Sequence, residues 1–313
     1  MPSGGIEKSE QNLLLLKRAR LSKTLFFRIK HFKVMKTVRI FAYGIALVSV
    51  ILSSLNQQNR GRTVAKTTVE GTLVFVANGE DFVRQGFVSK DGWNINFEHL
   101  YVNISDAIAY STESSFEPQK GDSKESINYQ NRINFDLPQT PDLAEGEANA
   151  EPIVVASAKA TEGFYNALAW KLSPGAADSL IPGNTMQLMG QATKDGEVID
   201  FDLGFNQPTE YICGEYIGEE RQGIVTENTS GVVEATFHFD HIFGDGDTPL
   251  EDAINQDALG FQPLANLALN GIVKLNEADL ASQLSPPDYQ QLTEQITSLG
   301  HVGEGHCVVT NSQ

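Results

Sequence analysis

Residues 93–104, WNINFEHLYVNI, decide the fold class of this 313-residue chain. Apolar and polar side chains alternate from Trp93 to Phe97, and a two-residue period is typical of a β-strand with one buried face. After Glu98 the apolar positions move by one residue, so the alternation continues out of phase. Such a shift predicts a β-bulge near His99. The segment therefore indicates a β fold whose strands each bury one side.

Further short segments with strand character recur along the chain, and turn-forming residues separate them. The additional predicted strands are residues 69–77, 153–160, 164–172, 186–192, 197–205, 211–217 and 231–243. Between two of them, Asp195-Gly196 favours a tight hairpin. The polar, turn-rich residues 111–131 and 138–152 predict long loops. Since no βαβ rhythm is visible, we expect a mainly β fold, an antiparallel β-sandwich or barrel.

The C-terminal part carries helix signals instead. Residues 261–269 can form one or two helical turns, and Asn276 is placed to cap a helix that ends near residue 284. Ser285 can cap the next helix, which Gly300 is expected to stop. We therefore expect two or three short helices packed on one end of the β domain.

The N-terminal segment has the composition of an export signal. Residues 1–39 contain ten Lys or Arg and two acidic residues, a net charge of +8, and an apolar run follows from Ile40 to Leu55. A basic segment before a short apolar run is typical of a signal peptide or signal-anchor helix. Positive charge on the N-terminal side of the run predicts that the following domain lies outside the cytoplasm.

The sequence leaves the fate of this leader open. An apolar run of 16 residues is short for a helix that crosses ~30 Å of hydrocarbon, yet basic flanks make it tolerable. The cleavage signal is weak, and Met35 offers a second start before the run. We predict a leader over residues 1–59 and an extracytoplasmic β domain over residues 60–313. The domain is expected in the periplasm, on the cell surface or secreted, with an inner-membrane anchor if the leader is retained.

The chain beyond residue 39 is strongly acidic. It carries 13 basic and 38 acidic residues, and hence a net charge of −25. A surface of this sign repels nucleic acid phosphates and anionic membranes, which excludes nucleic acid as a partner. We expect metal cations, or cationic or neutral ligands, and contact with a membrane only through the leader.

Cysteine usage agrees with export. The chain has two cysteines, Cys213 and Cys307, and an even number is typical of proteins in oxidising compartments. We expect a disulfide between them, which would close a loop of ~95 residues and add about 4 kcal/mol of stability in the chain-entropy model.

The layout resembles a group of poorly characterised secreted bacterial β-sandwich domains. The shared features are a strand with alternating apolar residues that ends in a histidine, here Ile95 to His99, and a Gly-x-Tyr turn into a strand, here Gly163-Phe164-Tyr165. The resemblance covers about half of the chain. It implies the fold class and the extracytoplasmic location, but no activity.

Histidines supply the one chemical lead. Five of the six lie beyond the leader, as His99, His238, His241, His301 and His306, four of them in the last 76 residues. Neutral imidazole is a common ligand of metal ions. The sequence predicts a metal site for zinc or copper, since nitrogen and oxygen ligands of this kind suit zinc or copper(II).

The ligands proposed for this site come from two segments. Two glycines let the loop between His301 and His306 fold back, so that both rings could face one point together with His238. Asp240 or His241 is the expected fourth ligand. In a regular strand over residues 234–243, His238 and Asp240 would share one face while His241 would point the other way. The alternative is that each histidine satisfies a local hydrogen bond or is exposed.

Two further metal assignments are weaker. His99 could join the site, although a structural role beside the bulge competes with this. Asp245, Asp247, Glu251 and Asp252 form an acidic loop whose oxygens could bind calcium, but the run lacks the twelve-residue pattern of an EF-hand. A solvated surface loop is the alternative.

Three functions remain open from the sequence. Motifs for a nucleophile elbow, a phosphate loop, a dinucleotide site and a His-Glu-x-x-His metalloprotease are absent from the chain. We expect a non-catalytic metal-binding protein for storage, sensing or delivery. The alternatives are a structural or adhesive β-sandwich without metal, and a metal-dependent hydrolase with a base such as Glu304.

Overall fold

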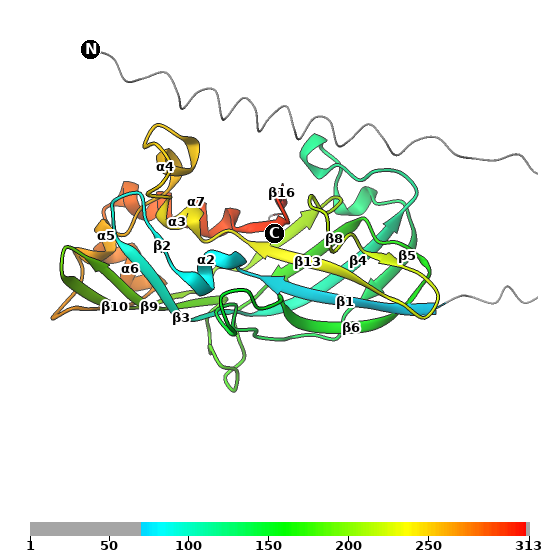
Figure 1. Ribbon diagram of the computed structural model, residues 1–313, viewed down its shortest axis with the longest axis horizontal. Coiled ribbons are helices and arrows are strands. Elements are labelled where there is room, and N and C mark those ends of the chain that lie inside the picture. Colours follow the sequence, from blue (N-terminus) through cyan, green and yellow to red (C-terminus); the bar gives the residue numbers. More distant parts are fainter. Residues whose placement is uncertain (1–69, 311–313) are drawn as a thin grey trace, which may run out of the picture. The chain divides into compact units, whose positions relative to one another are not determined.

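The computed structural model describes residues 70–310 and shows a mainly β fold with short helices (Figure 1). Three five-stranded sheets and one two-stranded sheet make up the strands. Antiparallel pairs predominate, which confirms the predicted mainly β, antiparallel-rich class. The three-sheet arrangement and two parallel pairs, β1 with β13 and β10 with β14, were not predicted.

Each large sheet draws strands from distant parts of the chain. Sheet A consists, in spatial order, of β16 (Gly305–His306), β15 (Gly300–Val302), β13 (Ser230–Phe237), β1 (Glu70–Asn78) and β6 (Ile153–Thr161). Sheet B consists of β14 (Ile272–Asn276), β10 (Glu197–Phe205), β9 (Met186–Lys194), β3 (Asn94–Val102) and β2 (Phe87–Val88). Sheet C consists of β17 (Val308–Thr310), β11 (Thr209–Cys213), β8 (Ala167–Leu172), β4 (Ile104–Thr112) and β5 (Tyr129–Asn134). The small sheet pairs β12 (Ile224–Val225) with β7 (Gly163–Phe164).

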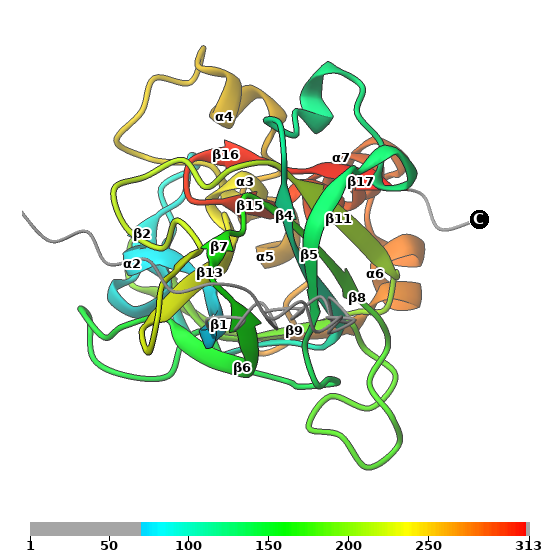
Figure 2. The same ribbon diagram turned by 90° about the vertical axis from the view of Figure 1, so that its right-hand side faces the viewer.

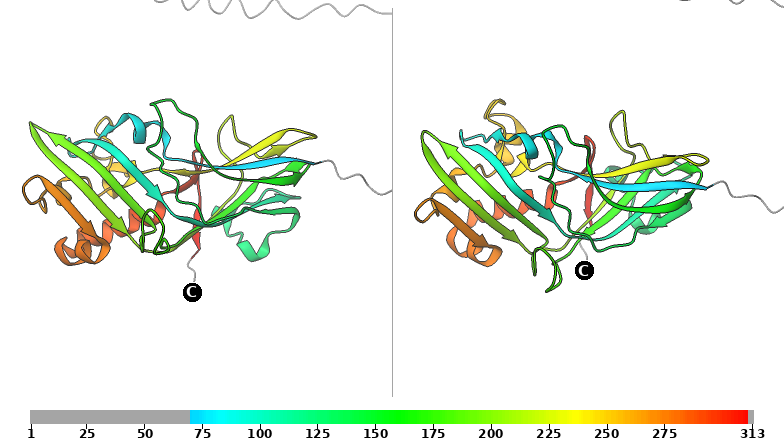
Figure 3. Two further views of the ribbon diagram at one scale, coloured as in Figure 1. Left: turned by 90° about the horizontal axis from the view of Figure 1, so that it is seen from below. Right: turned by 60° about the horizontal axis from the view of Figure 1, so that its bottom comes forward.

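The described helices are short. They are α2 (Glu80–Gln85), α3 (Asp240–Phe243), α4 (Ala253–Asp257), α5 (Gln262–Ala265), α6 (Glu277–Gln283), α7 (Pro286–Ser298) and the 3-10 turns η1 (Pro118–Lys120) and η2 (Lys124–Ser126). Figure 3 shows α6 and α7 beside the strands β9 and β10, and Leu280 and Leu292 of these helices are buried in the common core. Within residues 70–310, none of the helices combines the length and apolar character needed to cross a membrane.

Local signals in the sequence place several elements correctly. The register of β3 against β9 shifts between Phe97 and His99, so the bulge leaves Glu98 unpaired, as predicted. Asp195 and Gly196 both have positive φ angles, 51° and 87°, and form the tight turn between β9 and β10. The side chains of Asn276 and Ser285 accept hydrogen bonds from backbone N–H groups at the starts of α6 and α7, which confirms both caps.

Other predictions were wrong at chain reversals. The strand predicted over 93–104 ends at Val102, and the chain turns at the buried Asn103 into β4, which belongs to another sheet. The predicted loop over 111–131 holds η1 and η2, but its end forms part of β5. The helix α7 does end where predicted, with its C-cap at Leu299, and Gly300 directly begins β15. A Cβ at Gly300 would lie 2.4 Å from the Tyr211 ring, so the close approach of two sheets requires glycine there.

Sheets A and C lie on opposite sides of a shared core (Figure 2). One continuous apolar cluster joins Phe75 of sheet A, Phe201 of sheet B and Trp170 of sheet C. The described residues, 70–310, belong to one compact unit. The predicted boundary between residues 59 and 60, and the leader itself, fall outside the described residues.

Cys213 and Cys307 form a disulfide, with 4.5 Å between their Cα atoms. Val308 pairs with Ile212 at the end of the β11–β17 ladder, so the two cysteines occupy the next rung. The preceding residue, His306, already belongs to β16 of sheet A. The disulfide therefore fixes the point where the C-terminal chain passes from one sheet to the other.

Replacing both cysteines by serine is expected to lower the free energy of unfolding by about 4 kcal/mol, because the unfolded chain regains the entropy of a loop of 94 residues. Urea unfolding of the wild type and of the Cys213→Ser/Cys307→Ser variant, each with and without reductant, measures this. Reductant should destabilise the wild type and leave the double variant unchanged. An equal response of both proteins would show that the cysteines are not joined.

Candidate metal centre

His238 and His241 reach the same side of the chain because β13 ends earlier than predicted. The His238 N–H donates to the Leu299 carbonyl at 3.1 Å, and the chain then turns into α3 instead of continuing the sheet. In a helical turn, residues three apart lie on one face. The ring centroids of His238 and His241 are accordingly 5.5 Å apart. The predicted strand over 231–243, with His241 opposite His238, is therefore wrong beyond Phe237.

His301 and His306 face each other across a tight hairpin. They form a cross-strand pair of β15 and β16, joined by a turn at Gly303 and Glu304. Gly303 has a φ of 58°, a value that glycine adopts without strain. The ring centroids of the two histidines lie 4.3 Å apart. The glycines thus fold the loop back in the way that the sequence predicted.

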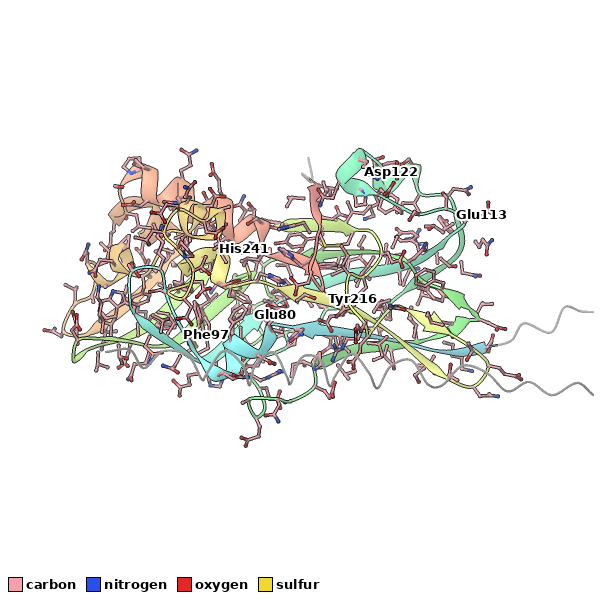
Figure 4. The ribbon with its side chains drawn as sticks, turned by 45° about the horizontal axis from the view of Figure 1, so that its top comes forward. Glu80, Phe97, Glu113, Asp122, Tyr216 and His241 are labelled. Atoms are coloured by element: carbon pink, nitrogen blue, oxygen red, sulfur yellow. A yellow bond between two sulfur atoms is a disulfide. The ribbon has the colours of Figure 1, made fainter. Side chains whose placement is uncertain are left out.

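The hairpin brings His301 beside the two imidazoles that follow β13. Its ring stacks on His238 at 3.9 Å between centroids and lies 5.1 Å from His241. One nitrogen from each of His238, His241 and His301 lies within 4.8 Å of the others, so this group could hold a metal ion. His306 is exposed and stands outside this trio, with its ring centroid 6.2 Å from that of His241. Figure 4 labels His241 in its place after β13, with Glu80 in the same region.

Burial leaves several polar atoms of this group without partners. His301 is 2% exposed, and neither of its ring nitrogens has a hydrogen-bond partner among the described residues. Nε2 of His238 and Oδ1 of Asp240 are likewise buried without a hydrogen-bond partner among the described residues. A buried polar atom without a partner costs roughly 1–3 kcal/mol. Buried groups of this kind usually have a role that requires them.

The surroundings keep the imidazoles neutral. Burial, and then the rings of His238, His306 and His241, lower the pKa of His301 to about 2. Burial also lowers the pKa of His238, although the Asp240 carboxylate opposes the shift. The pKa of His241 is lowered by burial and by His306. Neutral imidazole is the form that binds metal ions, so the trio is in the ligand state at neutral pH.

Coordination of one ion still requires the rings to turn. Tetrahedral zinc with Zn–N bonds of ~2.05 Å places its nitrogen ligands about 3.3 Å apart. The lone pairs of imidazole lie in the ring plane, and the planes of His238 and His301 are only 10° from parallel. At least one of the two rings must therefore tilt before both can point at the same ion.

The other predicted ligands have different positions. His99 does not join the group, because its Nδ1 lies 2.7 Å from Oδ2 of Asp142 and its ring stacks on Tyr101 beside the bulge. Asp240 begins α3 between the two histidines, but it is not a member of the trio. Burial raises its pKa.

The acidic loop that was considered for calcium is organised by its own hydrogen bonds. The amide of the buried Asn255 donates to three carbonyl groups of the loop, those of Asp245, Thr248 and Pro249. The Asp245 carboxylate accepts from the Asp247 N–H and the Thr248 hydroxyl. These bonds account for the loop's conformation without a cation.

Sequence reasoning missed Glu80, whose Oε1 lies 3.4 Å from Nε2 of His238. Burial, and then the carboxylates of Asp240 and Glu304, raise the pKa of Glu80 to about 7. The distance is within ion-pair range, but the lowered pKa of His238 and the raised pKa of Glu80 argue against a charged pair. Glu80 could have been assigned to the site only from the parallel pairing of β1 with β13, which brings the ends of the two strands to the same edge of the sheet.

Comparisons of the chain with models of protein families, with curated proteins and with solved structures found no match. The resemblance to secreted bacterial β-sandwich domains therefore stays a prediction. The case for a function rests on the geometry of the histidine group.

The low pKa of His301 makes the metal-free protein sensitive to acid. Below the unfolded-state value of 6.5 the unfolded chain binds a proton that folded His301 refuses down to about pH 2, so stability falls as pH falls. At pH 5 the loss from this residue should be about 2 kcal/mol. Above pH 6.5 this ring is neutral in both the folded and the unfolded chain, so the loss of stability disappears.

Urea unfolding at pH 7 and pH 5, with a chelator present, checks this. His301→Gln cannot titrate, so it should lose about 2 kcal/mol less than the wild type between the two pH values. Equal losses in the two proteins would contradict the assignment.

Proposed function

We propose that the protein binds a transition-metal ion, zinc or copper(II), through His238, His241 and His301, without catalysing a reaction. The observation that carries the proposal is the state of His301. Both of its ring nitrogens are buried without hydrogen-bond partners among residues 70–310, and its ring lies beside two further imidazoles. A bound ion would give one of these nitrogens a partner that the protein does not supply.

The donor set selects the class of metal. Three neutral imidazoles suit zinc and copper(II), whereas calcium and magnesium prefer oxygen ligands. The net charge of −25 beyond residue 39 attracts cations toward the domain. Histidine ligands do not separate zinc from copper(II), because affinities for both are high in such sites.

The proposed location is outside the cytoplasm. The Cys213–Cys307 disulfide is consistent with an oxidising compartment, and the basic segment followed by the apolar run 40–55 has the form of an export signal. His306 is bonded directly to Cys307, so the disulfide restrains the hairpin that carries His301.

The test is the metal affinity of the full-length protein. After removal of metal with a chelator, the wild type should bind about one equivalent of zinc or copper(II), measured by titration and by elemental analysis. His301→Ala should weaken binding at least ~100-fold, because it removes the central ligand.

His99→Ala is the matched control, since this histidine bonds to Asp142 away from the trio. It should leave the metal affinity unchanged. If the wild type binds no transition metal, the structural or adhesive alternative gains support. Ester or phosphate hydrolysis that a chelator abolishes would support the hydrolase alternative instead.

A further inference from the structure

We propose that Glu80 is the fourth ligand of the metal centre, so that the ion is held by three imidazoles and one carboxylate. This inference rests on the proposed function and names a residue outside the histidine trio. It also decides whether the coordination sphere is open or closed.

Strand register places Glu80 at the site. β1 and β13 run parallel with Asn78 opposite Thr236, and two more residues along each chain lead to Glu80 and His238. Parallel strands end at the same edge of a sheet, so these residues leave the sheet side by side. Oε1 of Glu80 and Nε2 of His238 then lie 3.4 Å apart. Among the described residues, Glu80 is the carboxylate whose oxygen comes within 4.0 Å of a nitrogen of the trio.

The separation fits two ligands of one ion better than it fits a direct bond. A charge-assisted N–H···O bond spans about 2.7–2.9 Å. In a tetrahedral zinc site with bonds of ~2.05 Å to nitrogen and ~2.1 Å to oxygen, the two ligand atoms lie about 3.4 Å apart. The 3.4 Å between Glu80 and His238 matches the second value.

The ring nitrogen of His238 that faces Glu80 lacks a partner. Nε2 of His238 is buried and has no hydrogen-bond partner among the described residues. An unprotonated Nε2 presents a lone pair, and an ionised carboxylate offers acceptor oxygens only. A cation bound between Nε2 of His238 and Oε1 of Glu80 would partner both atoms.

The backbone around Glu80 is built to hold this orientation. Glu80 has a φ of 64°, an unusual value for a residue with a side chain, and such strain gathers at functional sites. Its N–H donates to Oδ1 of Asn78 at 2.9 Å, and Nδ2 of Asn78 donates to the buried Glu234 at 3.0 Å. Arg221 pairs with Glu234 at 2.9 Å and completes the chain of support.

A carboxylate in the fourth position closes the sphere. Structural zinc sites have four protein ligands, whereas catalytic sites keep one position for water. With Glu80 bound, the centre holds its ion without an open position, in agreement with a non-catalytic role. Removal of the carboxylate would create such a position.

The experiment compares Glu80→Gln with Asp81→Asn in the full-length protein, using zinc and cobalt(II) as probes. Asp81 is the exposed acidic neighbour of Glu80, and both variants replace a carboxyl group by its amide. Asp81→Asn should bind zinc like the wild type, and Glu80→Gln should bind at least ~10-fold more weakly. Azide added to the cobalt(II) protein should change the visible spectrum of Glu80→Gln but not that of the wild type.

The outcomes separate the two claims. If the wild type and Asp81→Asn bind none of zinc, cobalt(II) and copper(II), both the proposed function and this inference fail. If His301→Ala loses the metal while Glu80→Gln matches Asp81→Asn in affinity and azide response, the metal site stands and the role of Glu80 is refuted. An azide response in the wild type would likewise show that the fourth position is open.

Discussion

Backbone hydrogen bonds join β1 to β13 in parallel, from Thr72 opposite Ser230 to Asn78 opposite Thr236. This ladder brings the ends of two strands from opposite parts of the chain to one edge, and β15 pairs with the last residues of β13 at that edge. His238, His301 and Glu80 all follow from this arrangement. Loss of the ladder would separate the carboxylate from the imidazoles, whatever happened to the rest of the core.

Imidazoles in this position meet two physical demands at once. The burial that removes water from His301 also lowers its pKa, so the ring is neutral beside the other histidines at neutral pH. Two charged histidines could not be packed with their ring centroids 3.9 Å apart without a large electrostatic cost. The same burial leaves nitrogens unpaired, which a globular protein normally avoids. A cluster of this kind is understandable when its lone pairs are needed by a ligand.

The sequence predicted those features that depend on neighbouring residues. The bulge at Glu98, the turn at Asp195-Gly196 and the cap at Asn276 each follow from a local pattern, and each is present. The end of β13 could not be read in this way, because the alternation of Phe237 and Phe239 imitates a continuing strand. Gly244 was the local sign of a helical turn, since its positive φ closes α3.

The membership of the site depended on pairing between distant segments, which one sequence does not reveal. His238, His241 and His301 were named because histidine is rare and chemically distinctive. Glu80 was missed because it is one of 40 acidic residues, and only a parallel partner for β1 gives it significance. His99 was included because of its residue type, although its partner Asp142 lies in a loop that carries no pattern.

The order of these segments along the chain has a consequence for biosynthesis. During translation β1 emerges early, β13 follows much later, and β15 and Cys307 come later still. β1 must therefore stay unpaired on its β13 side until the residues through Phe237 are available. Pairing between strands that are far apart in the sequence slows folding. An unpaired strand edge can meanwhile associate with a wrong partner. The histidine group cannot assemble before the hairpin of β15 and β16 is made, because His301 belongs to that hairpin.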